Sequence, residues 1–168
     1  MKYKFLSILI LFALAFAFSS CEEDRHLDWR YINMQWLEQQ KARLCEETGE
    51  RFWTETENGL LFRVINEGIG GNTFQYFPNE RSVVRVAYNG RFFNNFQFDY
   101  RPTTDPIENR LIVFVPGFQE ALRMMKRNAI LEIIIPYELG YGSGGMGVAI
   151  PPYSVLQFRI EMINFWTE

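Results

Sequence analysis

The sequence predicts an α+β domain: an antiparallel sheet wrapped around one short helix and preceded by a longer amphipathic helix. Three observations lead to this prediction. Residues 155–165 alternate apolar and polar side chains, as a half-buried antiparallel strand does. Residues 28–47 and 118–127 instead repeat apolar side chains every three or four residues, the period of a helix. Finally, the loop over 136–152 separates two strand-like runs and holds five of the 12 glycines and three of the seven prolines.

Residues 1–20 have the pattern of a signal peptide. Lys2 and Lys4 form a basic start, and 5–18 is an apolar run. The run is shorter than the roughly 20 residues of a membrane-spanning helix but suits the apolar core of a signal. The ending Phe-Ser-Ser-Cys resembles the lipobox of bacterial lipoproteins, which makes Cys21 a predicted lipidation site. The alternative is an ordinary secretory signal followed by an incidental cysteine.

An acidic cluster over residues 22–24 follows Cys21 directly. It resembles the export signal of surface lipoproteins in Bacteroidetes-type bacteria, and a solvated linker is the alternative reading.

The helix predicted over 28–47 contains neither glycine nor proline, and Asp28 is placed to cap it. The side chains expected along one face are Trp29, Ile32, Trp36, Gln40 and Leu44. Two tryptophans on one face need a surface to cover them. We expect the following domain to cover them, and the alternative is a helix that dimerises or binds a client protein.

From residue 52 onward the pattern changes to that of strands. Strand-like runs are predicted over 52–56, 60–65, 81–90, 129–135 and 155–165. Residues 91–100 are predicted to be a strand pair or a bulged strand, broken at Asn94-Asn95.

The segment between these strands contains the predicted short helix. Residues 101–110 are expected to be a polar loop, and 111–115 is a short apolar run closed by Pro116-Gly117. The helix over 118–127 places three apolar side chains on one face, namely Phe118, Leu122 and Met125.

Composition excludes several classes of function. The formal net charge is −3 over 168 residues, and residues 1–20 contribute two lysines and no acidic residue to it. Nothing here attracts a phosphate backbone, so nucleic acid is not an expected partner. One histidine (His26) and two cysteines (Cys21 and Cys45) exclude a histidine-based triad, a disulfide framework and a zinc site. Neither a metal nor another cofactor is expected.

The glycine loop contains the spacing G-x-G-x-x-G at Gly140, Gly142 and Gly145. A dinucleotide site needs a helix to begin there, so that its N-terminus faces the pyrophosphate. Pro151-Pro152 and a strand pattern follow instead, which excludes the phosphate interpretation.

Aromatic and apolar residues remain in quantity, and Asp99 stands inside one aromatic run, FQFDY. An apolar cavity with a few placed polar groups is the usual form of a small-ligand or peptide pocket. The alternative for Asp99 is a buried carboxylate that ties strands together.

Five motifs in order resemble the FK506-binding protein (FKBP) family of peptidyl-prolyl cis/trans isomerases. They are Val86-Ala-Tyr88-Asn-Gly90, Phe98-Asp99, Val115-Pro116-Gly117-Phe118, Tyr137 to Gly145 with Ile150-Pro151-Pro152, and Leu156 to Glu161. Residues 59–71 resemble the first strand of bacterial members that carry an N-terminal helical extension. The residue patterns and the resemblance together divide the chain into a signal peptide at 1–20, an acidic tether at 21–27, a helical extension at 28–50 and an FKBP-like domain at 52–166.

The resemblance also implies a pocket that accepts a proline ring. Its catalytic residues would be Tyr88, Asp99, Tyr141 and Ile150, and its substrate-binding residues Phe98, Phe114, Val115, Phe118 and Phe158. Phe118 would form the floor, where the family usually has tryptophan. The Tyr141 hydroxyl would reach over the substrate, and the Ile150 N–H would hold a substrate carbonyl. Two further departures from the family pattern are a shortened 105–114 segment and Asn109, which stands where a pocket phenylalanine is expected.

Rotation about an X-Pro bond needs neither covalent chemistry nor net proton transfer, so the lack of a usable histidine is no obstacle. The uncatalysed rotation takes on the order of tens to hundreds of seconds, and a pocket accelerates it by stabilising the twisted amide more than the planar one. The resemblance therefore implies an isomerase that assists the folding of exported proteins at the bacterial cell envelope, anchored through Cys21. The alternative is an FKBP-like chaperone or binding module with little catalysis.

Overall fold

The computed structural model describes residues 20–71 and 73–167, with side chains from Leu27 onward except that of Phe74. The signal peptide predicted over 1–20 therefore lies outside the described residues but for the backbone of Ser20. The side chain of Cys21, the predicted lipidation site, is likewise not described.

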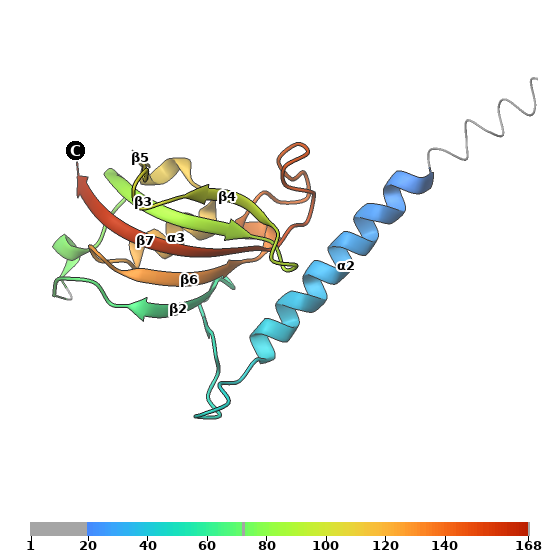
Figure 1. Cartoon of the computed structure of the whole chain (residues 1–168), viewed down its shortest axis with the longest axis horizontal. Helices are drawn as coiled ribbons and strands as arrows, with labels where there is room; N and C mark the ends of the chain where they lie inside the picture. The colour runs from blue at the N-terminus through green and yellow to red at the C-terminus, as the bar shows by residue number, and fades with distance from the viewer. Residues whose placement is uncertain (1–19, 72, 168) are drawn as a thin grey trace, which may run out of the picture.

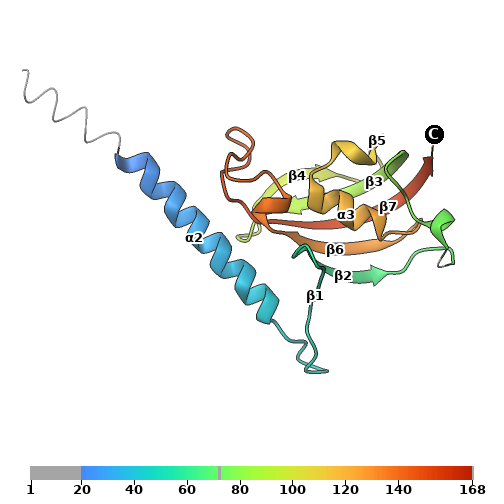
Figure 2. The same ribbon diagram turned by 180° about the vertical axis from the view of Figure 1, so that it is seen from behind.

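One antiparallel sheet forms the body of the domain, and a long helix, α2 (Ser20–Ala42), lies beside it (Figures 1 and 2). Within the described residues the sheet has seven strands in the order β1-β2-β6-β7-β3-β4, with β5 also paired to β3. The strands are β1 (Thr54–Glu55), β2 (Leu61–Asn66), β3 (Ser82–Arg91), β4 (Gln97–Arg101), β5 (Ile107–Arg110), β6 (Ile130–Ile135) and β7 (Leu156–Thr167). One short helix, α3 (Pro116–Arg123), packs on one face of the sheet, which confirms the predicted α+β fold.

Three single-turn 3₁₀ helices complete the described secondary structure: η1 (Phe74–Tyr76), η2 (Leu111–Val113) and η3 (Tyr137–Leu139). The break predicted at Asn94-Asn95 is confirmed. Asn95 adopts φ 64° and donates its N–H to the Phe92 carbonyl at 2.9 Å, so the chain turns between β3 and β4.

The prediction of a loop over 101–110 was wrong for its second half. Residues 107–110 form β5, which pairs with residues 83–86 of β3. Its sequence, IENR, carries one apolar residue and three exposed polar ones. An edge strand with this composition shows no alternation of apolar side chains, so the sequence pattern does not reveal it.

The short helix α3 begins two residues before the predicted start, because Pro116 fits the first turn of a helix. It ends at Arg123, and residues 124–127 are not helical. The predicted face is confirmed, since Phe118, Leu122 and Met125 are all buried in the main core against the sheet.

The helix α2 begins earlier and ends sooner than predicted, and its buried face was predicted only in part. The following domain covers Trp29 and Trp36, as expected, but two other positions of the predicted face are exposed. Ile32 and Leu44 are 43% and 56% exposed, whereas Asn33 and Leu37 are 0% and 2% exposed. The centre of the buried face is occupied by a polar residue, Asn33. A prediction that places only apolar side chains on the buried face therefore rotates that face away from its true position.

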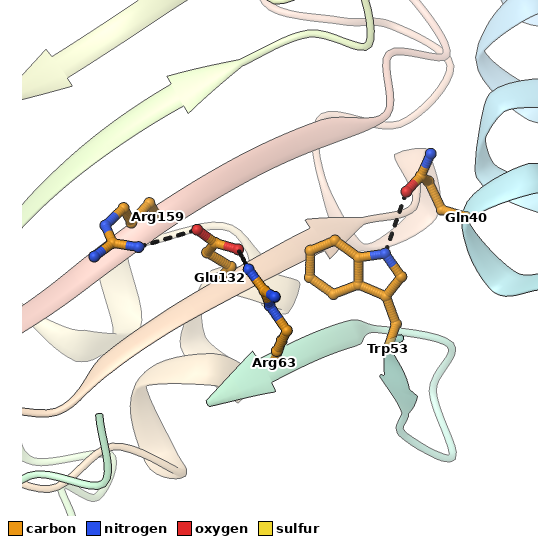
Figure 3. Close-up of polar contacts among 5 residues, drawn as sticks. All are labelled: Gln40, Trp53, Arg63, Glu132 and Arg159. Carbon is orange, nitrogen blue, oxygen red and sulfur yellow. Dashed lines mark hydrogen bonds and ion pairs between the residues drawn. The ribbon is translucent and has the colours of Figure 1, made fainter. Parts of the chain in front are cut away.

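The C-terminal half of α2 is held by a second, smaller core. Leu37 packs there with Trp53, Leu61, Ile134 and Val155, and the Trp53 Nε1–H donates to Gln40 Oε1 at 3.2 Å (Figure 3). None of the helices in the described part of the chain is long and apolar enough to cross a membrane.

An ion network joins three strands on the outer face of the sheet, the face that points away from the main core. Glu132 of β6 accepts from Arg63 of β2 at 2.6 Å and from Arg159 of β7 at 3.0 Å (Figure 3). The three residues stand directly opposite one another across the sheet, so the network follows from strand register.

Candidate active site

A cavity of about 650 Å³ opens between α3, the sheet and the glycine loop. It is lined by Tyr88, Phe98, Asp99, Ile107, Asn109, Val113, Phe114, Val115, Phe118, Tyr141, Met146, Ala149, Ile150 and Phe158. All nine residues that the family resemblance implied lie on its wall. The fold brings them together from five segments, while their individual roles remain predictions.

Phe118 forms the aromatic floor of the cavity and is 2% exposed. Its ring lies 5.0 Å from that of Phe114, 5.1 Å from that of Phe158 and 5.6 Å from that of Tyr88, measured between centroids. The Phe114 contact is stacked and the other two are edge-to-face, both favourable aromatic geometries. The Phe118 ring is therefore packed against three other aromatic rings.

Gly90 allows two of the wall rings to meet at the end of β3. A side-chain carbon at this position would lie 2.6 Å from the Phe158 ring and 2.9 Å from the Phe98 ring. Those rings pack edge-to-face at 5.5 Å. The Val-x-Tyr-x-Gly motif thus needs glycine at this position, because the two rings lie too close to the backbone for any side chain.

Tyr88 and Asp99 form the polar pair of the cavity wall. The Tyr88 hydroxyl donates to Asp99 Oδ2 at 2.8 Å, and the Tyr100 backbone N–H donates to Oδ1 at 2.8 Å. Burial, and then the hydrogen bond to the Asp99 carboxylate, raise the pKa of Tyr88 well above its ordinary value. The phenol therefore stays protonated at neutral pH, and the carboxylate is fixed by two donors.

Tyr141 supplies a second hydroxyl, from the glycine loop. Burial, and then the charge of Asp99, raise the pKa of Tyr141. No hydrogen-bond partner for this hydroxyl lies among the described residues, in contrast to that of Tyr88. The Tyr141 hydroxyl is thus a protonated donor available to a ligand.

The tip of the glycine loop closes on itself. Met146 N–H donates to the Ile150 carbonyl at 2.8 Å, and Ile150 N–H donates to the Met146 carbonyl at 3.3 Å. The N–H expected to hold a substrate carbonyl already has an internal, long bond, so a substrate must displace or share it. Val115, also on the wall, has a backbone N–H for which the described residues offer no partner.

Four wall residues were not part of the predicted site, namely Ile107, Val113, Met146 and Ala149. Ile107 is brought to the cavity by β5, the strand that the sequence pattern did not reveal, and Val113 by η2. Asn109, which departs from the family pattern, also lines the cavity and makes part of that wall polar. Within the described residues, no group of three or more His, Cys, Asp or Glu side chains could hold a metal ion.

Comparison with known proteins gives the same family for this fold and cavity. Residues 75–163 match the family model described as FKBP-type peptidyl-prolyl cis-trans isomerase. The chain is 39% identical over 110 residues to the FKBP-type 22 kDa peptidyl-prolyl cis-trans isomerase of Escherichia coli strain K12, covering 65% of this chain and 51% of that protein. It is 35% identical over 112 residues to the peptidyl-prolyl cis-trans isomerase Mip of Coxiella burnetii, covering 64% and 45% of the two chains.

Among solved structures, the crystal structure of FkpA from Escherichia coli superposes with a TM-score of 0.78 at 25% identity. That alignment covers 95% of this chain and 71% of FkpA. The chain spans about half the length of the curated relatives it matches, or less. The matched family region contains every residue that lines the cavity, and the chain belongs to the FKBP-type peptidyl-prolyl cis-trans isomerase family.

Proposed function

We propose that the protein is a peptidyl-prolyl cis/trans isomerase that binds a proline ring in the aromatic cavity. The observation that carries this proposal is the combination of the Phe118 floor with the unpaired Tyr141 hydroxyl at one opening. An apolar cavity of about 650 Å³ accommodates a proline ring and its flanking peptide units.

Catalysis in this proposal is electrostatic and conformational. The planar amide is charge-separated, so a dry aromatic wall disfavours it relative to the twisted amide. Tyr141 donates to a carbonyl next to the proline, and the N–H of Ile150 or Val115 holds a second one. Asp99 orients Tyr88 and keeps a fixed dipole at the wall. Both phenols stay protonated, so no group is asked to act as a base.

The test is a protease-coupled or NMR assay of a proline-containing peptide with residues 22–168. The proposal predicts acceleration over the uncatalysed rate, and Tyr141→Phe should lower kcat/KM by roughly three- to tenfold, as expected for one hydrogen bond. Tyr153→Phe, also on the glycine-loop side but outside the cavity lining, is the matched control and should act like the wild type. A folded protein that gives no acceleration would refute the isomerase proposal.

The second candidate is a binding module with little catalysis. The internal bond of the Ile150 N–H favours it, because a donor already engaged contributes less to substrate binding. Binding of the proline peptide without acceleration in the same assay would support this candidate instead.

We further propose that the protein assists exported proteins at the cell envelope and is held there by lipid on Cys21. Support comes from the signal-like residues 1–20 and the lipobox-like ending before Cys21. In cells, Cys21→Ala should move the protein from the membrane fraction to the soluble fraction. Unchanged membrane retention would rule out this anchor.

A further inference from the structure

The segment 150–155 leads from the cavity wall into β7, and α2 contacts it from outside the cavity. Ile150 lines the cavity, while Ser154 and Val155 are buried next to the helix. Figures 1 and 2 both show α2 passing the end of the sheet from which the glycine loop and the β3–β4 turn project. The contacts join residues more than 120 positions apart in sequence.

A two-step hydrogen-bond chain runs from α2 to the residue after Ile150. Trp29 Nε1–H donates to Ser154 Oγ at 3.0 Å, and Ser154 Oγ–H donates to the Pro151 carbonyl at 2.6 Å. A hydroxyl has one proton and accepts through its lone pairs, so both bonds are satisfied at once. Trp29 thereby fixes the hydroxyl that holds the carbonyl of Pro151, the residue after Ile150.

Asn33 supplies a second connection, one turn further along α2. Its Oδ1 accepts from the Val155 backbone N–H at 2.9 Å, and its Nδ2–H donates to the Trp29 carbonyl at 2.8 Å. Asn33 is 0% exposed, and a buried amide is tolerated only when it is hydrogen-bonded. An apolar residue would fill this place but leave the Val155 N–H without an acceptor. The asparagine therefore sets the register of α2 on the segment.

The same helix also contacts the turn between β3 and β4. The Trp29 ring lies 5.4 Å from that of Phe92 and 5.2 Å from that of Phe93, in the turn after β3. Phe92 in turn lies 4.7 Å from Phe98, a wall residue. One tryptophan thus contacts both the segment that follows the glycine loop and the turn whose Phe92 packs on the wall residue Phe98.

We infer that α2 is a positioning element of the cavity, acting through Trp29, Asn33 and Ser154 to hold the 150–155 segment against the wall. The catalytic consequence rests on the proposed function, while the positioning itself does not. The buried amide and the hydroxyl of this contact both reach the backbone of the segment directly after Ile150, a residue that lines the cavity. We expect loss of the relay to loosen Ile150 while the sheet stays folded.

The experiment compares Trp29→Phe and Ser154→Ala in the full protein. Both should raise the hydrogen-exchange rates of the Ile150 and Tyr153 amides by at least about fivefold, because these amides report local opening of the loop. Both should also lower kcat/KM for a proline peptide by roughly three- to tenfold, at a temperature where each variant is folded. The double variant should lose no more than the worse single one, since both changes break the same chain.

Gln40→Ala is the matched control. It removes the Gln40–Trp53 hydrogen bond, which also joins α2 to the domain but lies away from the cavity (Figure 3). It should lower the melting temperature without changing the two exchange rates or kcat/KM. Equal exchange in all variants, or an equal rise with Gln40→Ala, would overturn the inference. If the wild type has no isomerase activity, the proposed function fails and the exchange rates alone test the positioning.

Discussion

At the residue scale, the two tyrosines of the cavity have the same chemistry and different partners. The Tyr88 hydroxyl is occupied by Asp99 at 2.8 Å, whereas that of Tyr141 has no partner among the described residues. Both are held in the protonated form by burial and by the nearby carboxylate. The Tyr88 proton is therefore already used in a hydrogen bond within the wall, whereas the Tyr141 proton has no such bond among the described residues.

Glu132, on the outer face of the sheet, has a pKa that is shifted down, whereas the pKa values of the two tyrosines are shifted up. Burial raises the pKa of Glu132, but the hydrogen bonds and charges of Arg63 and Arg159 more than offset it, so the pKa lies below its ordinary value. A carboxylate with a lowered pKa contributes stability above its unfolded-state value of 4.5, and that stability is lost as pH falls through the folded-state pKa.

We therefore predict that Glu132→Gln lowers the free energy of unfolding by about 1 kcal/mol at pH 7, a modest figure because Arg159 is half-exposed. Urea unfolding at pH 7 and at pH 3.5 measures it, and the difference from wild type should shrink at the lower pH. The exposed Glu57→Gln is the control and should match wild type at both. A deficit that stays constant with pH would contradict the role of the ion network.

At the element scale, the glycine loop is shaped by individual glycines. Gly145 has φ +66°, and a side-chain carbon there would overlap the Ile150 carbonyl oxygen. Gly144, its neighbour, has no positive φ, and a side-chain carbon added there would have nothing within 4 Å. Both positions are glycines of the same loop, but only Gly145 has a backbone conformation and surroundings that exclude a side chain. Substitutions at the two positions therefore form a matched pair.

We predict that Gly145→Ala lowers kcat/KM by about tenfold or more, because it displaces the loop that carries Tyr141 and Ile150. Gly144→Ala should stay within about twofold of wild type, since alanine fits there without strain. Both variants are to be compared by isomerase assay and by thermal unfolding. Equal activity of the two variants would show that the loop conformation does not matter for the reaction.

The same scale shows which elements a sequence can predict. The strand β7 was predictable because Phe158, Ile160 and Met162 alternate with polar residues, and one face of α3 because its apolar residues repeat helically. The edge strand β5 was not, since its pairing with β3 is made by backbone groups and not by apolar side chains. Part of the buried face of α2 was missed because its central residue, Asn33, is polar and is buried through its hydrogen bond to Val155, 122 residues away.

In the candidate site, too, some features could be predicted from the sequence and others could not. Its nine residues followed from the family resemblance, and the fold brings all of them to one cavity. The resemblance could not indicate that the Ile150 N–H bonds internally to Met146, because a loop's own hydrogen bonds depend on its three-dimensional closure. Nor could it indicate the contact of Trp29 with Ser154, which joins the helical extension to the family domain.

At the scale of the whole molecule, the cavity is assembled from segments that are distant in sequence. Its floor comes from α3, its walls from β3, β4, β5 and β7, and its rim from the glycine loop, with α2 behind that rim. The sheet joins these segments, since β3 pairs with β4, β5 and β7 at once. We propose that this assembled cavity holds a proline and promotes rotation of the bond before it.

NMR exchange spectroscopy on a proline-containing peptide with ¹⁵N-labelled protein tests that claim most directly, because one sample reports both rotation and binding site. We predict faster cis/trans exchange of the peptide, together with amide shift changes concentrated at Phe118, Tyr141, Ile150 and Phe158. Absence of faster exchange with a folded protein, or shift changes gathered away from the cavity, would contradict the account.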